Sequence, residues 1–228
     1  MTVGDGQEPG MSQELVRMLR PLDLRSGNHN DDCGCVEVKA RSWAPSGELH
    51  AVGLGGYQYL LGLLSVSDEL ARRREHGLGS VTDLRTLEVL SSLPVDVPVA
   101  AKVLGSEALS VLRPLPSAVV EFDGAKVVRH LAPAVVLESA GVFATTWKQA
   151  VARISALASY CTRYVILGGD RGRAQMELAT MDARYYGLGL ATVAGGELEW
   201  LVEPAPFRPE RFTASSWLLA EKVFDQLP

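Results

Sequence analysis

The chain has 228 residues, of which 47% are hydrophobic and 21% are charged, and it carries a formal net charge of −5 at pH 7. A chain of this length and composition buries a core of its own, in one large or two small domains, as ordinary globular proteins do. The net negative charge excludes an overall basic field that attracts nucleic acid. Any contact with DNA therefore has to come from local basic patches.

The cysteine content and the start of the chain predict a cytoplasmic protein. The three cysteines give no disulfide framework, since their number is odd and Cys33 and Cys35 are too close for a bridge. Residues 1–10 are polar and glycine-rich, without the apolar core of a signal peptide, and we expect a disordered tail there. No run approaches the ~18 apolar residues of a membrane span, so we expect no membrane contact.

Two short strands are predicted near the amino terminus. They are residues 22–24 and residues 35–39, joined by a run rich in turn formers. Alternation places Glu37 and Lys39 on one face of the second strand, and pairing of the strands brings Asp23 to that face. Two carboxylates so close together suit Mg²⁺ (or Mn²⁺), which lowers the pKa of a bound water and steadies a phosphoryl transition state.

This arrangement resembles the Asp…Glu-x-Lys signature of the PD-(D/E)xK (restriction-endonuclease-like) nuclease superfamily. Here the signature reads Asp23, thirteen intervening residues, then Glu37-x-Lys39. The resemblance implies that Asp23 and Glu37 hold the metal ion and that Lys39 assists the attacking water. It also implies that Arg41, just after the second strand, contacts the phosphate backbone of the substrate.

Each of these residues also has a plain structural explanation. A Glu-x-Lys pattern on an exposed strand is usually a solvated face. Glu14, in a short helix predicted over residues 13–20, is either a further metal ligand, as helical acids of that superfamily often are, or an exposed acid near a helix N-terminus. His29 with Cys33 and Cys35 suggests a zinc half-site, but no second Cys/His pair follows at a familiar spacing.

Residues 49–64 predict a strand and a buried segment. The strand covers residues 49–54 and ends at Gly55-Gly56, and residues 57–64 are mostly apolar, with a helix expected if the segment continues towards Val66. Gln58, between two tyrosines, is similar to a glutamine on the helix that follows the Glu-x-Lys strand in RecB-like nucleases. The similarity implies contact with substrate. A polar side chain that caps a loop explains Gln58 equally well.

The charged segment 67–77 predicts a helix that Ser67 caps and Gly77 stops. The helix carries the run Arg72-Arg73-Arg74. Three neighbouring arginines usually form a solvated face of a helix, and we interpret them so. Binding of phosphate by the same three side chains is the alternative, because guanidinium groups are common phosphate ligands.

Residues 82–131 carry three predicted helices and a hairpin. The helices cover residues 83–93, 98–104 and 107–112, and Asp123-Gly124 between alternating strands is the strongest short hairpin signal. This order resembles a winged helix-turn-helix domain, which implies a recognition helix at residues 106–113. The segment is slightly acidic, whereas phosphate contacts need lysine and arginine, so packing or protein contact is an equal alternative to DNA binding.

From Thr145 onwards, helical and apolar extended patterns alternate. Helices are predicted over residues 147–160 and 174–186, and strands over 164–167, 187–193 and 197–202. Such alternation favours parallel pairing and a βαβ unit. The succession resembles the C-terminal half of restriction-endonuclease-like folds. A last helix, from residue 213 or 214 to residue 226, is expected to pack on the core or to form a dimer contact.

The sequence therefore predicts an α/β fold with a restriction-endonuclease-like central mixed sheet flanked by helices. The nuclease-like core is assigned to residues 11–80 and 140–228, and a winged-helix-like insertion to residues 81–139. The predicted function is that of a metal-dependent DNA endonuclease or a nuclease-fold DNA-processing protein. The alternative is a non-catalytic winged-helix DNA-binding or regulatory protein on the same scaffold.

DNA is the expected partner, with a homodimer or partner subunits as further options. A third function, that of a small-molecule α/β enzyme, has no supporting constellation. The chain has no Gly-x-Ser-x-Gly, no phosphate-binding loop and only four scattered histidines.

Overall fold

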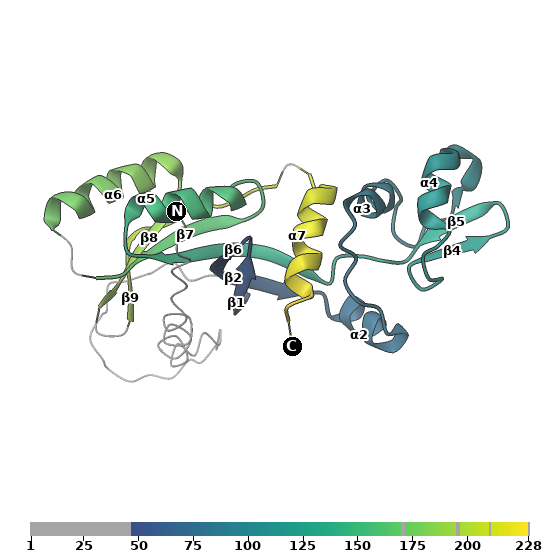
Figure 1. Cartoon of the computed structure of the whole chain (residues 1–228), viewed down its shortest axis with the longest axis horizontal. Helices are drawn as coiled ribbons and strands as arrows, with labels where there is room; N and C mark the ends of the chain where they lie inside the picture. The colour runs from purple at the N-terminus through teal and green to yellow at the C-terminus, as the bar shows by residue number, and fades with distance from the viewer. Residues whose placement is uncertain (1–46, 170–171, 195–196, 210, 228) are drawn as a thin grey trace, which may run out of the picture.

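The computed structural model describes residues 47–169, 172–194, 197–209 and 211–227. Its centre is a six-stranded sheet in the order β1-β2-β6-β7-β8-β9, with helices packed against it (Figure 1). The strands are β1 (Glu48–Leu54), β2 (Tyr57–Ser65), β6 (Val135–Ala144), β7 (Thr162–Leu167), β8 (Gly189–Ala194) and β9 (Glu197–Val202). β1, β2 and β6 pair antiparallel, β6, β7 and β8 pair parallel, and β9 returns antiparallel to β8. The predicted α/β fold with a mixed central sheet flanked by helices is confirmed.

β1 and β2 form a hairpin that turns at Gly55-Gly56. Both glycines have positive φ, 58° and 82°, which residues with a side chain rarely adopt. The expectation of a helix over residues 57–64 is wrong, because these residues form β2. Leu61 belongs to the cluster on the helix side of the sheet and Leu60 to the cluster on the opposite side. A strand buried on both faces lacks the apolar–polar alternation that identifies a strand from sequence.

Two helices connect the parallel strands. α5 (Trp147–Ile154), followed by a 3-10 turn (Ser155–Leu157), joins β6 to β7, and α6 (Arg173–Tyr186) joins β7 to β8. The Thr146 side chain caps α5 by accepting a hydrogen bond from the backbone N–H of Gln149 at 3.3 Å. Gly187 ends α6 with a φ of 64°. The predicted βαβ unit is confirmed, with α5 shorter than expected because its last residues form the 3-10 turn.

β6 joins the antiparallel part of the sheet to the parallel part, and the sequence patterns do not predict it. Its residues pair with β2 on one side and with β7 on the other. It begins at Val135, inside the range 81–139 that the sequence assigns to the insertion. Gly141 of β6 lies against the ring of Tyr164, since a Cβ atom at this position would be 2.2 Å from the ring carbon Cε2. The close approach of the two strands here requires glycine.

A smaller unit is formed by the residues between β2 and β6. It contains α2 (Ser67–His76), α3 (Leu84–Ser91), β3 (Val99–Ala100), a 3-10 turn (Ala101–Val103), α4 (Gly105–Leu112), β4 (Val120–Asp123) and β5 (Lys126–Arg129). The last two strands and β3 form an antiparallel sheet in the order β3-β5-β4. The hairpin predicted at Asp123-Gly124 is confirmed. The helix predicted over residues 98–104 is wrong, because Val99 pairs with Val127 of β5, a long-range contact that overrides local propensity.

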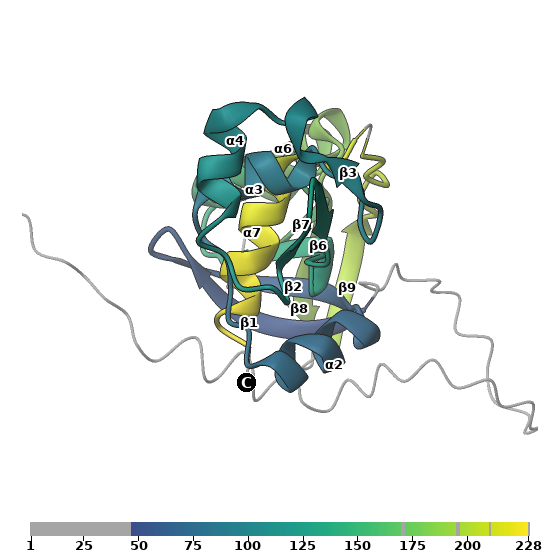
Figure 2. The same ribbon diagram turned by 90° about the vertical axis from the view of Figure 1, so that its right-hand side faces the viewer.

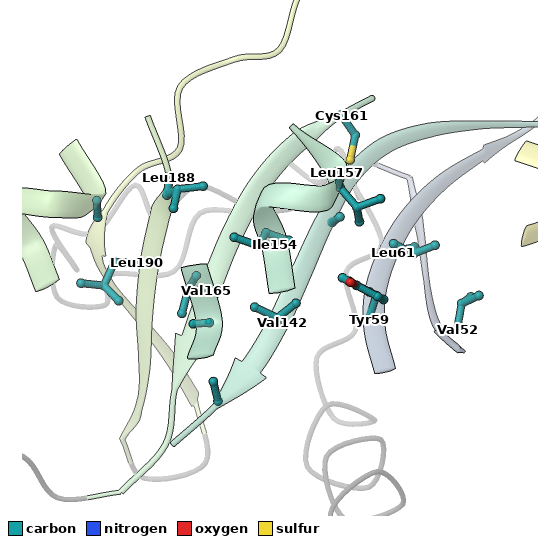
Figure 3. Packing of buried hydrophobic residues seen from close by; sticks show 14 of the residues in the cluster. Val52, Tyr59, Leu61, Val142, Ile154, Leu157, Cys161, Val165, Leu188 and Leu190 are labelled. Carbon is teal, nitrogen blue, oxygen red and sulfur yellow. The ribbon is translucent and has the colours of Figure 1, made fainter. Parts of the chain in front are cut away.

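Two hydrophobic clusters fill the molecule, and α7 (Ala214–Phe224) belongs to both. The larger cluster lies between the sheet and α5, α6 and α7, and Figure 3 shows part of it. The second cluster fills the smaller unit. Trp217 of α7 is buried in the second cluster, whereas Ala220 and Val223 are buried in the first. α7 also packs beside α3 (Figure 2).

Within the described ranges, no helix combines the length and the apolar character that crossing a membrane requires.

Candidate functional site

The residues of the predicted metal site lie outside the described part of the chain. Asp23, Glu37 and Lys39 precede residue 47, as does Arg41, the predicted phosphate contact. The other candidate ligands, Glu14 and the set His29, Cys33 and Cys35, precede it as well. Among the described residues, no three His, Cys, Asp or Glu side chains form a group that could hold a metal ion. The predicted triad therefore stays a prediction.

Gln58, the predicted substrate contact, lies near the start of β2 and is exposed. It pairs with Gly53 of β1, beside the hairpin turn, and does not cap a loop. The tyrosines on either side of it serve the fold. The Tyr59 hydroxyl donates to the carbonyl of Arg153 at 3.2 Å, and the Arg153 guanidinium lies 5.0 Å from the centre of the Tyr57 ring. Gln58 is thus available at the surface, on a strand and not on the helix that the resemblance implies.

The interpretation of Arg72-Arg73-Arg74 as a solvated face is wrong for its central member. Arg73 is buried, and its guanidinium donates two hydrogen bonds to the carboxylate of Glu221 in α7, at 2.8 and 2.6 Å. It donates a further bond to Glu69 at 2.8 Å. Burial acts to lower the pKa of Arg73, but the hydrogen bonds and charges of Glu221 and Glu69 outweigh it and raise that pKa.

The other two arginines of the run are placed differently. Arg72 donates to the carboxylate of Glu69 at 2.7 and 2.9 Å and to the carbonyl of Ala118, which ties α2 to the smaller unit. Arg74 is exposed. A phosphate site built from the three side chains is therefore also wrong, because two of them are engaged within the protein. α2 ends at Gly77, as predicted, but its N-cap is Val66 and no side chain caps it.

A cleft of about 580 Å³ lies at the start of β6, beside the extended segment after β9 and beside α7. One wall is apolar and carries prolines and phenylalanines, namely Pro204, Pro206, Phe207, Pro209 and Phe212. The backbone N–H of Phe207 donates to Oγ1 of Thr162 at 3.0 Å, which holds this wall against β7. A concave site with an apolar wall and a few polar groups is the usual form of a small-molecule or peptide site.

The charged side chains of the cleft are Glu138, Glu203 and Arg211, which sum to −2 + 1 = −1. Glu138 stands at a bulge in β6, because Gly62 of β2 pairs with Ser139 whereas the next residue, Leu63, pairs with Leu137. Bulges re-aim a side chain relative to its strand, and they are frequent beside binding sites. Among the described lining residues there is no histidine, so the cleft fits binding of a partly apolar ligand better than acid–base chemistry.

The two potential nucleophiles near this cleft are buried. The Ser139 side chain is fully buried, and its Oγ has no hydrogen-bond partner among the described residues. Burial also raises the pKa of the Cys161 thiol to about 12. A thiol with such a pKa carries almost no thiolate at neutral pH, so Cys161 is a core residue and not a reactive one.

Sequence analysis missed this cleft because its lining comes from segments that are far apart in the chain. The start of β6, the turn before β7, the segment after β9 and α7 each contribute. The one local signal is the repetition of proline from residue 204 to residue 209, with Phe207 among the prolines. That pattern predicts an extended segment, but it does not indicate which elements the segment faces.

On the smaller unit, several cations that a DNA-binding surface would need are engaged within the protein. Arg85 forms ion pairs with Glu88, at 3.4 Å, and with Glu107 of α4. Arg129 lies 5.1 Å from the centre of the Trp217 ring and donates to the carbonyl of Leu90 at 2.9 Å. The exposed cations that remain on this unit include Lys102, Arg113 and Lys126. Three dispersed charges give a weak electrostatic footprint for nucleic acid.

Comparisons of the chain with protein-family models, with curated proteins and with solved structures found no match.

Proposed function

We propose that the chain is a metal-dependent DNA endonuclease or a nuclease-fold DNA-processing protein. The observation that carries the proposal is the order of parts along the chain. The Asp23…Glu37-x-Lys39 motif precedes β1 by a few residues. After it come the antiparallel β1–β2 hairpin and the parallel run β6-α5-β7-α6-β8.

The resemblance to restriction-endonuclease-like folds extends to the second half of that order. In those folds a helix leads to a strand, then to a helix and a strand bracketed by glycines. Here α5, β7, α6 and β8 follow one another, with Gly187 ending α6 and Gly189 beginning β8. The agreement supports the proposal because it lies downstream of the motif and is independent of it.

In this proposal Asp23 and Glu37 hold the metal ion and Lys39 positions the attacking water. Magnesium or manganese bound there supplies a nucleophilic hydroxide and offsets the charge of the scissile phosphate. Arg41 and Gln58 contact the substrate. Gln58 suits such a contact because it is exposed at the hairpin that follows the motif.

A second candidate function is that of a non-catalytic DNA-binding or regulatory protein. The order of the smaller unit favours it, since α3, β3, a 3-10 turn, α4 and the β4–β5 hairpin follow one another with β3 paired to β5. This is the order of a winged helix, with α4 as the recognition helix. The internal pairing of Arg85 and Arg129 favours protein contact by this unit over tight binding of phosphate.

Incubation of plasmid DNA with the protein and Mg²⁺ or Mn²⁺ tests the first function. We expect metal-dependent cutting that Glu37→Gln and Lys39→Ala each reduce by about a hundredfold or more, because each removes a group acting on the transition state. Glu75→Gln and Lys222→Ala are matched controls, since both side chains are exposed on helices of the described structure. Intact plasmid with both metal ions contradicts the nuclease proposal.

A gel shift on the same DNA separates the second function from the first. A regulator retards DNA without cutting it, and its affinity falls as salt rises. Lys102→Ala with Lys126→Ala then lowers the salt dependence by about one unit of slope for each phosphate that is no longer neutralised. Neither cutting nor retardation is the result that rejects both functions and leaves a role in protein contact.

A further inference from the structure

α6 carries an apolar stripe on the side turned away from the sheet. The stripe consists of Ala174, Leu178, Met181 and Tyr185, and the last three are 60%, 68% and 84% exposed. The opposite side of the helix, with Ala179 and Ala183, is buried against the sheet. α6 lies at one end of the long axis of the molecule, over β8 and β9 (Figure 1). Large side chains gathered on one exposed helix face mark an interaction surface.

The spacing along the stripe is that of a helix that packs against another helix. The intervals from Ala174 to Leu178, Met181 and Tyr185 are four, three and four residues. These are the a and d positions of a heptad, which meet a partner helix across a narrow seam. The Tyr185 ring contacts the Tyr186 ring edge-on at 5.0 Å, and this contact supports the outermost side chain of the stripe.

We propose that the α6 stripe is the contact between two copies of this chain, with their α6 helices antiparallel about a two-fold axis. The axis passes between Leu178 and Met181, so that each Leu178 faces the Met181 of the other copy. The same operation places Ala174 opposite Tyr185, the smallest side chain against the largest. Such alternation of small and large side chains across a seam is what close packing of two helices needs.

The charges beside the stripe distinguish a second copy from other partners. Glu177 and Arg184 are both exposed and occupy the same flank of the stripe. In the antiparallel pair, Glu177 of each copy lies within reach of Arg184 of the other, so the charges are complementary twice. A parallel pair would instead bring each of these side chains opposite its own kind, with repulsion. Within one copy Glu177 is bound to Arg173 at 2.8 Å, which leaves carboxylate oxygen positions for a second guanidinium.

The size of the surface sets the expected strength of the contact. A stable dimer buries about 1,200–2,000 Å² in total, more than one face of a 14-residue helix provides. The pair is therefore a reversible dimer with a dissociation constant on the order of micromolar or weaker.

Sedimentation equilibrium of the full chain over a wide concentration range tests the proposal. We expect a monomer–dimer equilibrium, and Leu178→Glu with Met181→Glu raises its dissociation constant by about tenfold or more. Val97→Glu with Val103→Glu is the matched control, since these valines are 50% and 72% exposed on the smaller unit. The control pair leaves the equilibrium unchanged. A wild-type chain that stays monomeric at every concentration overturns the proposal, as does an equal effect of the control pair.

Charge reversal tests the antiparallel register separately. Glu177→Arg alone and Arg184→Glu alone each weaken the dimer about two- to tenfold, because each reversal creates two repulsive pairs at an exposed site. The double reversal restores the wild-type constant, since opposite charges then face each other across the axis again, with their signs exchanged. Lys222→Glu, an equal charge change on α7, has no effect. Failure of the double reversal to restore binding overturns the antiparallel pairing.

Discussion

Arg73 of α2 and Glu221 of α7 are joined by two parallel hydrogen bonds, Nη1 to Oε2 at 2.8 Å and Nη2 to Oε1 at 2.6 Å. Both side chains are almost completely buried, although 148 positions separate them in the sequence. The same carboxylate accepts from Nε1 of Trp217 at 2.9 Å and from the backbone N–H of Val81 at 2.9 Å. Glu221 thus ties α7 to α2 and to the smaller unit through one fully hydrogen-bonded group.

Loss of Arg73 is expected to destabilise the fold strongly. Arg73→Met leaves the carboxylate of Glu221 buried without its cation, which costs about 3–5 kcal/mol in the free energy of unfolding. Denaturant unfolding followed by circular dichroism measures this loss. Arg74→Met is the matched control, because Arg74 is the next residue of the same helix and is exposed, and it should change stability by less than about 0.5 kcal/mol. Similar losses for both variants contradict the assignment.

Cys161 is expected to make stability fall at alkaline pH. Burial raises the pKa of its thiol from 9.0 to about 12, so between these values the unfolded chain releases a proton that the folded chain keeps. The contribution is complete below pH 9.0 and is lost as the pH rises towards 12. The unfolding free energy of wild type should therefore fall more steeply than that of Cys161→Ala, by up to about 1.4 kcal/mol per pH unit.

Unfolding titrations between about pH 8 and pH 10.5 give this difference in slope. Alkylation provides an independent check, since the peptide that contains Cys161 should stay unlabelled in the native protein and become labelled in denaturant. Parallel stability curves for the two proteins, or rapid native labelling of Cys161, show that the thiol is not buried as described.

Gly141→Ala is expected to disturb the centre of the sheet. The new Cβ atom would lie 2.2 and 2.4 Å from two carbons of the Tyr164 ring, which is fully buried and has no room to withdraw. Overpacking of this kind costs about 1–3 kcal/mol or more. Gly79→Ala, where no described atom lies within 4 Å of the new Cβ, serves as control and should be neutral.

Combining Gly141→Ala with Tyr164→Leu identifies the cause of that loss. The smaller side chain at position 164 makes room for the methyl group, so the double variant should lose less stability than the sum of the two single variants, by about 0.5–3 kcal/mol. Strict additivity points to a cause other than the contact between these two residues.

Asp83 is expected to stabilise α3 only while it is ionised. Its carboxylate accepts from the side-chain hydroxyl and the backbone N–H of Thr86, and these hydrogen bonds lower its pKa from the usual 3.8. A lowered pKa means that the contribution is present above pH 3.8 and is lost as the pH falls through the folded value. Asp83→Ala should therefore lower the melting temperature at neutral pH and have a smaller effect below about pH 3.

Asp83→Asn is the companion variant for that measurement, because asparagine caps a helix without titrating. It should stay close to wild type at neutral pH and show no loss of its own on acidification. An Asp83→Ala variant that melts with wild type at neutral pH shows that this cap does not stabilise α3.

The parts of the fold that the sequence predicts correctly depend on contacts between residues close in the chain. The β4–β5 hairpin follows from Asp123-Gly124, and α6 follows from a helical pattern that ends at Gly187. The errors lie where distant contacts decide. β6 pairs with β2 and β7, yet its own sequence is broken by Glu138 and Ser139, so its pattern indicates no strand.

The same distinction applies to the candidate sites. The burial of Arg73 depends on Glu221, which no local pattern connects to it, and therefore the run of three arginines predicts a solvated face instead. The cleft beside β6 is assembled from four segments, and only its proline-rich wall is visible in the sequence. The α6 stripe, by contrast, is local, and its four-three-four spacing is present in the sequence.

The position of α7 in both hydrophobic clusters has a consequence for synthesis of the protein. Trp217 completes one core and Ala220 and Val223 complete the other, so neither core closes before the residues of α7 are available. On the ribosome, both parts of the nascent chain remain incomplete until this helix emerges from the exit tunnel, and folding is delayed to the end of translation.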